Sequence, residues 1–166
     1  MHKSADTTAL TEHDSKINNI DFILLNLKTL KSRLKQKADN MIIDHIRDLD
    51  EFKQLYESRP MNDGQYSFEH IINNPYLFCF YGENDKILKG FIFITQDKQK
   101  RLFLSGASIR KNMSDNIQAI LTVCKAFKQD IYSDTDKKEA QIVLLKSGFE
   151  KIDTNFFVKR HKNGKI

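Results

Sequence analysis

Near its carboxyl end the chain reads Glu139-Ala-Gln-Ile-Val-Leu-Leu-Lys-Ser-Gly-Phe-Glu-Lys-Ile-Asp-Thr-Asn-Phe-Phe-Val-Lys-Arg160, and this stretch decides the fold. Ala140, Val143 and Leu144 recur at helical spacing, so the first part of the stretch predicts an amphipathic helix. Gly148 stands where a left-handed helix end needs a residue without a Cβ. An extended segment starts at Phe149. The stretch therefore predicts a helix, a glycine stop and two short strands.

The same local signals place the other elements, working outward. Apolar residues at helical spacing mark helices, and runs rich in aromatic and β-branched residues mark strands. Asp48 and Asp136 each precede a Glu by three residues, which is the capping-box spacing, and Ser114 is the expected cap of another helix. Gly90, inside an expected strand, indicates a bulge or a close approach. The sequence predicts strands at 41–46, 76–81, 87–95, 102–109, 130–133, 149–152 and 155–160, and further helices beginning at Asp48, Ser67 and Ser114.

The element order β, α, α, β, β, β, α, β, α, β, β and the spacing Ala140-x-x-x-Leu144-x-x-x-Gly148-Phe149 resemble the Gcn5-related N-acetyltransferase (GNAT) fold. The resemblance covers residues 41 to 160. It implies an α/β protein of the α+β type, in which helices flank a central mixed sheet that is mostly antiparallel. A helical extension precedes this domain, and we expect no internal repeat and no second domain.

Two segments come before the domain. Residues 1–14 are polar and without periodicity, so we expect a disordered or extended arm. Residues 15–39 carry an apolar stripe with spacings of three and four, which predicts an amphipathic helix. The stripe could pack on its own domain or bind a partner or second copy, and both readings stay open. Its members, the candidate partner-binding residues, are Ile20, Ile23, Leu27, Leu30 and Leu34.

Composition narrows the class of protein. The 166 residues suit one domain with an extension, and Lys and Arg outnumber Asp and Glu by 27 to 22. The excess lies at 28–37 and 159–165, and we expect residues 161–166 to form a basic tail. Such short runs are usually solvated, so we do not expect nucleic-acid binding. Cys79 and Cys124 have apolar neighbours and no paired spacing, which predicts core thiols and neither a disulfide nor a metal site. Without a signal-peptide or membrane pattern, a cytoplasmic protein is expected.

The resemblance also implies where acetyl-CoA would bind. In the family, backbone N–H groups at the start of the helix after the fourth strand hold the pyrophosphate, within an Arg/Gln-x-x-Gly-x-Gly/Ala turn. Arg110 matches this pattern, but Met113 and Asp115 stand where the two small residues belong. Asp115 also suits the first turn of a helix without ligand. We therefore expect a degenerate site and no cofactor. If acetyl-CoA binds, the residues that hold it are Ile109, Arg110, Lys111, Asn112, Met113, Ser114, Asp115 and Asn116.

The catalytic groups implied by the resemblance are replaced. The tyrosine that commonly protonates the departing thiolate corresponds to Leu144, and an asparagine seven residues earlier corresponds to Lys137. Residues 101–109 contain no carboxylate that could act as a base. Tyr132 is the first candidate to test, because the fifth strand borders the acyl-CoA cleft in this fold. Other candidates are His70, Glu83, Asp130 and Asp134, whereas His2, His13, His45 and His161 share no spacing with a nucleophile or metal ligands.

Two functions fit these residues. The first is a GNAT-fold protein without acetyltransferase activity, which acts in an assembly through its surface and N-terminal helix. Residues 144–149 and the pattern Leu104-Ser-Gly-x-x-x-Arg-Lys111 also resemble acetyltransferase-like internal virion proteins of short-tailed phages, which implies a bacterial host cytoplasm or a virion as location. The second is an active acetyl-CoA-dependent N-acetyltransferase with an atypical cofactor loop. An open gap between the fourth and fifth strands would favour the enzyme.

Overall fold

The architecture is that of a computed structural model, which describes residues 41–58, 66–109 and 113–162. The order of the elements is the one that the sequence predicts. Their bounds are β1 Met41–Asp44, α2 Leu49–Ser58, α3 Phe68–Ile72, β2 Leu77–Gly82, β3 Leu88–Gln96, β4 Leu102–Ser108, α4 Met113–Lys125, β5 Ile131–Asp134, α5 Lys138–Lys146, β6 Glu150–Asp153 and β7 Phe156–Lys159. The arm and helix expected before residue 40, with the stripe from Ile20 to Leu34, lie outside the described residues.

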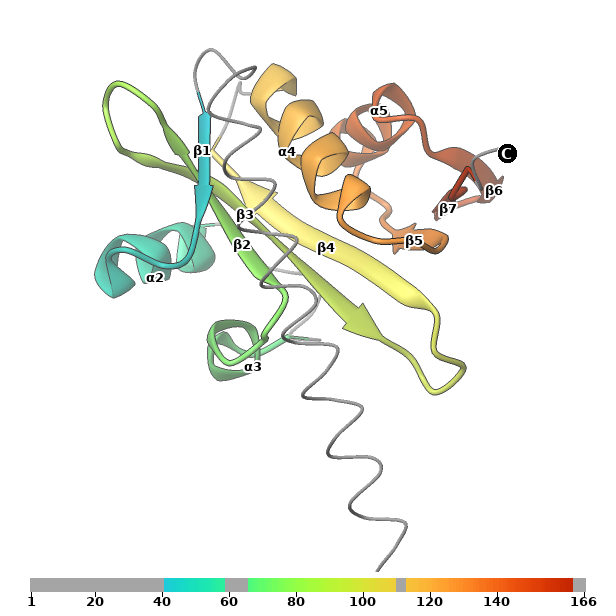
Figure 1. Cartoon of the computed structure of the whole chain (residues 1–166), viewed down its shortest axis with the longest axis horizontal. Coiled ribbons are helices and arrows are strands. Elements are labelled where there is room, and N and C mark those ends of the chain that lie inside the picture. Colours follow the sequence, from blue (N-terminus) through green and yellow to red (C-terminus); the bar gives the residue numbers. More distant parts are fainter. Residues whose placement is uncertain (1–40, 59–65, 110–112, 163–166) are drawn as a thin grey trace, which may run out of the picture. The chain divides into compact units, whose positions relative to one another are not determined.

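The described strands form one sheet in the order β1-β2-β3-β4-β5-β7-β6 (Figure 1). β1 to β4 form an antiparallel meander, and β7 pairs antiparallel with both β5 and β6. β5 runs parallel to β4, because α4 carries the chain across the sheet between them. The mixed, mostly antiparallel sheet flanked by helices confirms the predicted fold class.

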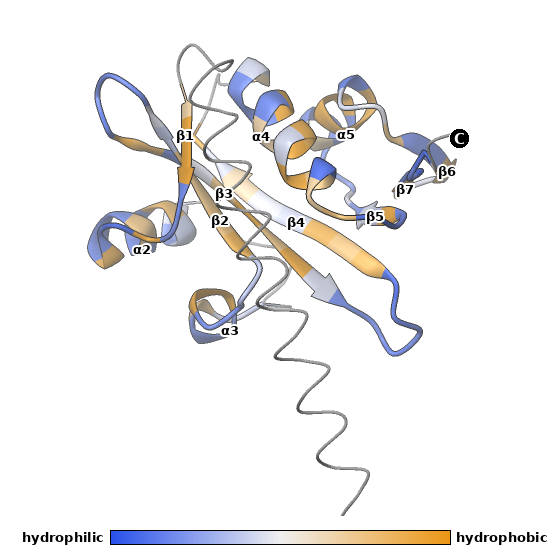
Figure 2. Cartoon of the chain, in the orientation of Figure 1, coloured by the Kyte–Doolittle hydropathy of each residue, from blue (hydrophilic) through white to orange (hydrophobic). Residues whose placement is uncertain are grey.

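The helices lie on the two faces of this sheet (Figure 1). α2 and α3 lie on one face, and α4 and α5 lie on the other. On the first face, Phe52, Ile71 and Phe91 are fully buried in a cluster that joins the two helices to β2 and β3. All six residues of β2 are buried, and Figure 2 shows β2 and β3 as largely hydrophobic strands. The core therefore lies on both sides of the central strands.

Two helix starts follow the sequence. Asp48 Oδ1 accepts a hydrogen bond from the backbone N–H of Glu51 at 3.0 Å, so the predicted cap of α2 is confirmed. The Glu51 carboxylate has a different partner from that of a capping box: it accepts from the backbone N–H of Leu88 at 2.9 Å. Ser67 caps α3 by accepting from the N–H of His70 at 3.1 Å. Glu51 thus ties α2 to the start of β3.

Two predicted caps are wrong. α4 begins at Met113, so Ser114 lies inside its first turn and does not precede it. Asp136 does not cap α5 either, because Lys137 occupies the cap position and makes no capping bond with its side chain. The backbone N–H of Lys137 instead reaches Thr135 Oγ1 at 3.3 Å. A Ser or Asp near a helix start is a common cap, but its register along the turn is set by the preceding strand.

Two glycines confirm their predicted roles. Gly148 has a φ of +83°, the left-handed conformation that ends α5. Beside it, the Lys159 ammonium donates to the Ser147 carbonyl at 2.5 Å and places a cation at the negative end of the helix. A Cβ at Gly90 would lie 2.2 Å from Phe80 Cζ, so β3 can pass this ring only with glycine.

Candidate functional site

The candidate cofactor site begins where β4 and β5 separate. The two strands pair in parallel at Leu102 with Ile131 and at Phe103 with Tyr132, and the ladder then stops. On its other edge, β4 continues to pair with β3 as far as Ser108. The central strands of the sheet therefore diverge after Phe103.

Backbone groups of β4 lose their strand partner at this divergence. The N–H of Ile109 donates to a β3 carbonyl at 2.9 Å. Since the direction of the backbone groups alternates along a strand, those of Gly106 and Ser108 point toward the side that β5 has left. Nearer the paired end, the Leu104 carbonyl accepts from the Ser133 hydroxyl at 3.0 Å. The Ser133 side chain thus bridges β5 to β4 at Leu104, and β5 does not pair with β4 beyond this point.

Ser108 and Asn116 tie the end of β4 to the first part of α4. Asn116 Nδ2 donates to Ser108 Oγ at 2.7 Å, while Asn116 Oδ1 is buried without a hydrogen-bond partner. If the oxygen and nitrogen of the amide were exchanged, Oδ1 would bond to Ser108 and Nδ2 would be the buried atom without a hydrogen-bond partner. An unpaired buried polar atom of this kind costs about 1–3 kcal/mol. The link fixes the strand to the helix at some cost in stability.

Five of the eight residues predicted to hold acetyl-CoA are described in the structure. Ile109, just after β4, and Met113, the first residue of α4, are 36% and 37% exposed. Residues 110–112 lie outside the described residues. Ser114 is exposed and Asp115 is half-buried, both in the first turn of α4. A carboxylate in this turn stabilises the positive end of the helix and repels a phosphate.

Leu144, which stands at the position of the family's tyrosine, and the candidate base Tyr132 lie on opposite faces of the sheet. Leu144 is 3% exposed on α5, on the face that carries α4 and α5. Tyr132 pairs with Phe103, which shares a face with Ala107, and Ala107 packs against the cluster under α2 and α3. Tyr132 therefore cannot take the place of a side chain at Leu144.

Tyr132 belongs to a group of three half-buried rings from β4, β5 and β7. The ring centroids of Phe103, Tyr132 and Phe156 are 5.6 to 5.9 Å apart. The Arg101 guanidinium lies 5.5 Å from the centroids of both Phe103 and Tyr132, and its Nε donates to Asp97 at 2.8 Å. We call the three rings with Arg101 the aromatic platform. The Tyr132 hydroxyl has no hydrogen-bond partner among the described residues, so no described group prepares it for proton transfer.

The Asp130 side chain holds the segment that follows β7. Its carboxylate accepts from the backbone N–H of His161 at 2.7 Å and pairs with Arg160 at 3.1 Å. The His161 N–H, with Arg160 in support, holds the pKa of this carboxyl below its usual range despite some desolvation. A carboxylate with a lowered pKa is a poor base, so the structure does not support Asp130 as a catalyst.

The other candidate bases are not gathered at one place. Glu83 lies in the exposed turn between β2 and β3, and His70 lies on α3 with its ring 5.5 Å from that of Tyr66. Asp134 is exposed at the end of β5, two residues beyond Tyr132 and on the same face. Of these candidates, the strand register brings only Asp134 close to Tyr132.

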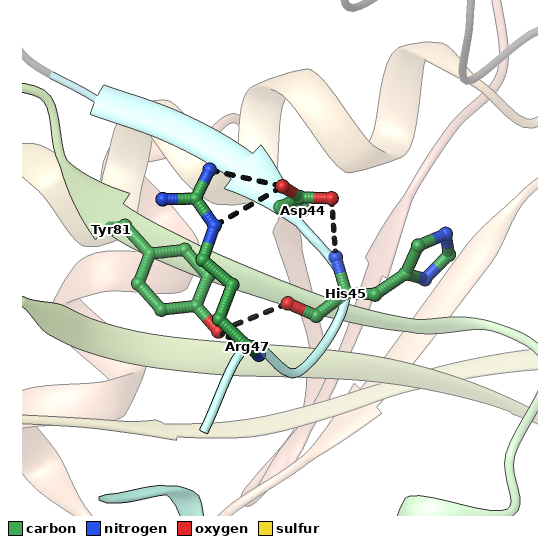
Figure 3. A network of polar contacts seen from close by, with 4 residues as sticks. All are labelled: Asp44, His45, Arg47 and Tyr81. Carbon is green, nitrogen blue, oxygen red and sulfur yellow. Dashed lines mark hydrogen bonds and ion pairs between the residues drawn. The ribbon is translucent and has the colours of Figure 1, made fainter. Parts of the chain in front are cut away.

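Figure 3 shows a polar network that the sequence did not predict, made of Asp44, His45, Arg47 and Tyr81. The Tyr81 hydroxyl donates to the His45 carbonyl and accepts from the Arg47 N–H, both at 2.9 Å. Arg47 binds Asp44 through Nε and Nη2 at 3.2 and 3.0 Å and lies 4.6 Å from the Tyr81 ring. Burial raises the pKa of Tyr81 to about 12, so the hydroxyl keeps its proton. This corner network holds the turn between β1 and α2 against β2. A tyrosine in an otherwise apolar strand was its one sequence signal.

The two cysteines lie in the core of the domain. Cys79 and Cys124 are buried and free, which confirms them as core residues, and burial raises the pKa of each to about 12. Within 41–58, 66–109 and 113–162, no group of three or more His, Cys, Asp or Glu side chains could hold a metal ion. Over the same ranges, no helix has both the length and the apolar character needed to cross a membrane.

No protein-family model matches the sequence, and no curated protein does. Solved structures do. A GNAT-family acetyltransferase from Bacillus anthracis matches over 76% of this chain and 98% of its own, with a TM-score of 0.58 and 13% identity. A Vibrio cholerae protein assigned as a ribosomal-protein-serine acetyltransferase matches over 74% of this chain and 95% of its own, with a TM-score of 0.57 and 10% identity. At such identities the likeness shows the fold: this chain has the GNAT fold.

Proposed function

We propose that this chain is a GNAT-fold protein with a degenerate acetyl-CoA site, which works as a non-catalytic structural or assembly protein. The observation that carries the proposal is Asp115 in the first turn of α4. A diphosphate at this helix start would meet a carboxylate where the family pattern has a small residue, and two negative charges oppose each other there. Met113 begins the same turn with a bulky side chain in place of the other small residue.

The groups available for proton transfer support the same proposal. Leu144 is buried where a tyrosine commonly protonates the thiolate, and a leucine side chain has no proton to give. β4 contains no carboxylate that could act as a general base on the acceptor. Tyr132 lies on the other face of the sheet from Leu144. Binding and catalysis are thus disfavoured by different residues.

The expected role is contact with other proteins. Residues 15–39, with their apolar stripe, are the proposed partner-binding segment, and the resemblance to phage internal virion proteins suggests that the assembly is a virion. Deleting residues 1–39 should leave a folded domain and abolish self-association or partner binding, as measured by light scattering and co-purification. Loss of the cooperative thermal transition in the truncated chain would place the segment in the core instead.

The alternative is an active acetyl-CoA-dependent N-acetyltransferase with an atypical cofactor loop. The divergence of β4 from β5 favours it, because backbone groups of Gly106 and Ser108 are left without β5 as a partner. Lys146 also reaches the start of α4, where its Nζ lies 3.7 Å from Met113 Sδ, and its charge would attract a phosphate. Backbone donors do not require particular side chains, so these features keep the alternative testable.

Calorimetric titration of the full chain with acetyl-CoA separates the two functions. We expect no binding at millimolar ligand, and a micromolar dissociation constant would overturn the proposal. The double variant Met113→Gly with Asp115→Ala restores two small residues and should gain measurable affinity. Glu139→Ala is the matched control, because it removes a first-turn carboxylate from α5 and should gain none.

A further inference from the structure

Within the described residues, α2 and α3 cover only part of the width of their face of the sheet. The apolar cluster under these helices draws on β2 and β3 and reaches β4 only at Ala107. The aromatic platform lies on the same face, on β4, β5 and β7. Phe103 pairs with Tyr132, so these two side chains share a face. Phe156 pairs with Asp134, which lies two residues after Tyr132 and therefore on the same face as Tyr132. The cluster includes none of the three rings. They form an apolar surface at the margin of the covered area.

Arg101 is held on this surface and keeps hydrogen-bond donors that no described residue uses. Asp97 accepts from its Nε at 2.8 Å and from its backbone N–H at 2.9 Å, and two rings lie 5.5 Å from its guanidinium. No described group accepts from its two terminal amino groups. A guanidinium carries five N–H donors and binds a carboxylate through two parallel bonds. Arg101 is thus fixed in orientation, and its side chain is 42% exposed.

Arg47 shows the same arrangement with one more of its nitrogens engaged by an aspartate. Its guanidinium also lies over a ring, that of Tyr81, and its side chain is 38% exposed. Its Nε and Nη2 both donate to Asp44 Oδ2, at 3.2 and 3.0 Å, so one of its two terminal amino groups is already engaged by a carboxylate. The difference between the two arginines lies in the donors that remain, and only slightly in exposure.

Further cations gather around Arg101. Leu102, at the start of β4, pairs with the start of β5, which pairs with the end of β7, so the β3–β4 turn and the segment after β7 lie at one end of the sheet. Lys98, Lys100 and Lys162 are exposed there, and none has an ion-pair partner among the described residues. Figure 2 shows the β3–β4 turn as strongly hydrophilic. This end of the sheet therefore places unpaired positive charge beside an apolar surface.

We propose that the aromatic platform binds an acidic segment of a protein partner, in which carboxylates flank an apolar side chain. A carboxylate would take the terminal donors of Arg101, the apolar side chain would pack on Phe103, Tyr132 and Phe156, and the nearby lysines would attract the remaining charge. The proposal names a partner class for the binding role given above and rests on it. Nucleic acid fits less well, because the guanidinium already lies over two of the rings on which bases would stack.

Fluorescence anisotropy tests this with the full chain and a short labelled peptide in which glutamates flank a phenylalanine and a leucine. We expect saturable binding with a dissociation constant of about 10–100 µM, and at least tenfold weaker binding of the matched peptide with glutamines, on the order of one charge-assisted pair. Arg101→Lys keeps the charge but loses the two-donor fork, and should weaken binding about tenfold. Arg47→Lys is the matched control and should change the affinity less than about twofold.

Four results would overturn the proposal: no saturable binding at millimolar protein, equal affinity for the glutamine peptide, equal loss in Arg47→Lys and Arg101→Lys, or tighter binding of labelled oligothymidine. Thermal unfolding of both variants checks that they fold. If Arg101→Lys does not fold, the pair Lys98→Gln with Lys100→Gln, both exposed, must weaken the peptide instead. Acetyl-CoA binding is measured apart, so an active cofactor site and an idle platform give different results.

Discussion

The corner network and the aromatic platform lie on one face of the sheet and use the same parts: an arginine over an aromatic ring, with an aspartate beside it. At the corner, Tyr81 is 1% exposed, and its hydroxyl both donates and accepts a hydrogen bond. On the platform, Tyr132 is half-buried and its hydroxyl has no described partner. Arg47 spends two donor nitrogens on its aspartate, whereas the Arg101 side chain spends one.

Burial explains the difference. Under α2 and α3 an unpaired polar group would cost about 1–3 kcal/mol, so each polar atom that the fold buries there needs a partner. On the platform, water can serve an unpaired donor, and the fold gains little by satisfying it. Among the described residues, satisfied polar groups are therefore concentrated under α2 and α3, and unpaired donors remain on the aromatic platform.

The largest expected contrast is between two phenylalanines. Phe52 is fully buried, with its ring 4.8 Å from that of Phe91, so Phe52→Ala should lower the free energy of unfolding by about 3–5 kcal/mol through lost burial and a cavity. Phe103→Ala removes a half-buried ring and leaves a space that water can enter, so it should lower the free energy of unfolding by about 1 kcal/mol. Urea unfolding measures both.

Equal losses at the two positions would show that something covers the platform in the intact protein and would break the comparison. If Phe52→Ala does not fold, Phe52→Leu against Phe103→Leu carries the same contrast. Both leucine variants keep an apolar side chain at the site, so the expected difference is smaller but has the same direction.

A smaller contrast is expected for the two tyrosine hydroxyls. Tyr81→Phe leaves the His45 carbonyl and the Arg47 N–H without their partner, and should cost about 2 kcal/mol of unfolding free energy. Tyr132→Phe removes a hydroxyl without a described partner and should stay within about 0.5 kcal/mol. The same urea titrations report both values. A loss at Tyr132 as large as that at Tyr81 would reveal a bond that the platform hides.

Local sequence signals were enough for the fold and for some of its details. Apolar residues at helical spacing placed the described helices, and runs rich in aromatic and β-branched residues placed the strands. Gly148 and Asp48 were recognised because their roles depend on the next few residues only. Ser114 and Asp136 failed as caps for a related reason. Whether a residue stands before a helix or inside it depends on where the preceding strand ends, which tertiary packing decides.

The site was harder to predict because it depends on register. Nothing in the sequence places Phe103 beside Tyr132 and Phe156, since the three residues come from strands that become neighbours only in the folded sheet. The Asn116 link to Ser108 depends in the same way on how α4 is seated against β4. Substituted motif positions such as Met113 could be read directly, because the resemblance supplied a residue-by-residue template. The resemblance supplied no such template for the aromatic platform, because the family pattern does not describe this surface.

The smallest expected effect is the response to acid at Asp130, just before β5 at the end of the sheet where Arg101 lies. The backbone N–H of His161, and secondarily Arg160, lower the pKa of Asp130, so its folded value lies below the unfolded value of about 4. The stability that this bond contributes is fully present above the unfolded pKa and is lost as the pH falls through the folded pKa. Tyr81 titrates at about 12, so acid leaves the corner hydroxyl unchanged. The Asp130 and Arg160 side chains are 34% and 54% exposed, so the effect should be slight.

Asp130→Asn sharpens this expectation, because it removes the titrating group and keeps most of the shape. Urea midpoints measured between about pH 5 and pH 2 should fall less steeply for Asp130→Asn than for the unchanged protein. Tyr81→Phe is the control from the covered part: it lowers the midpoint at every pH, and its slope with pH should match that of the unchanged protein. Parallel slopes for all three proteins would mean that the bonds of Asp130 add nothing to the stability of the folded state.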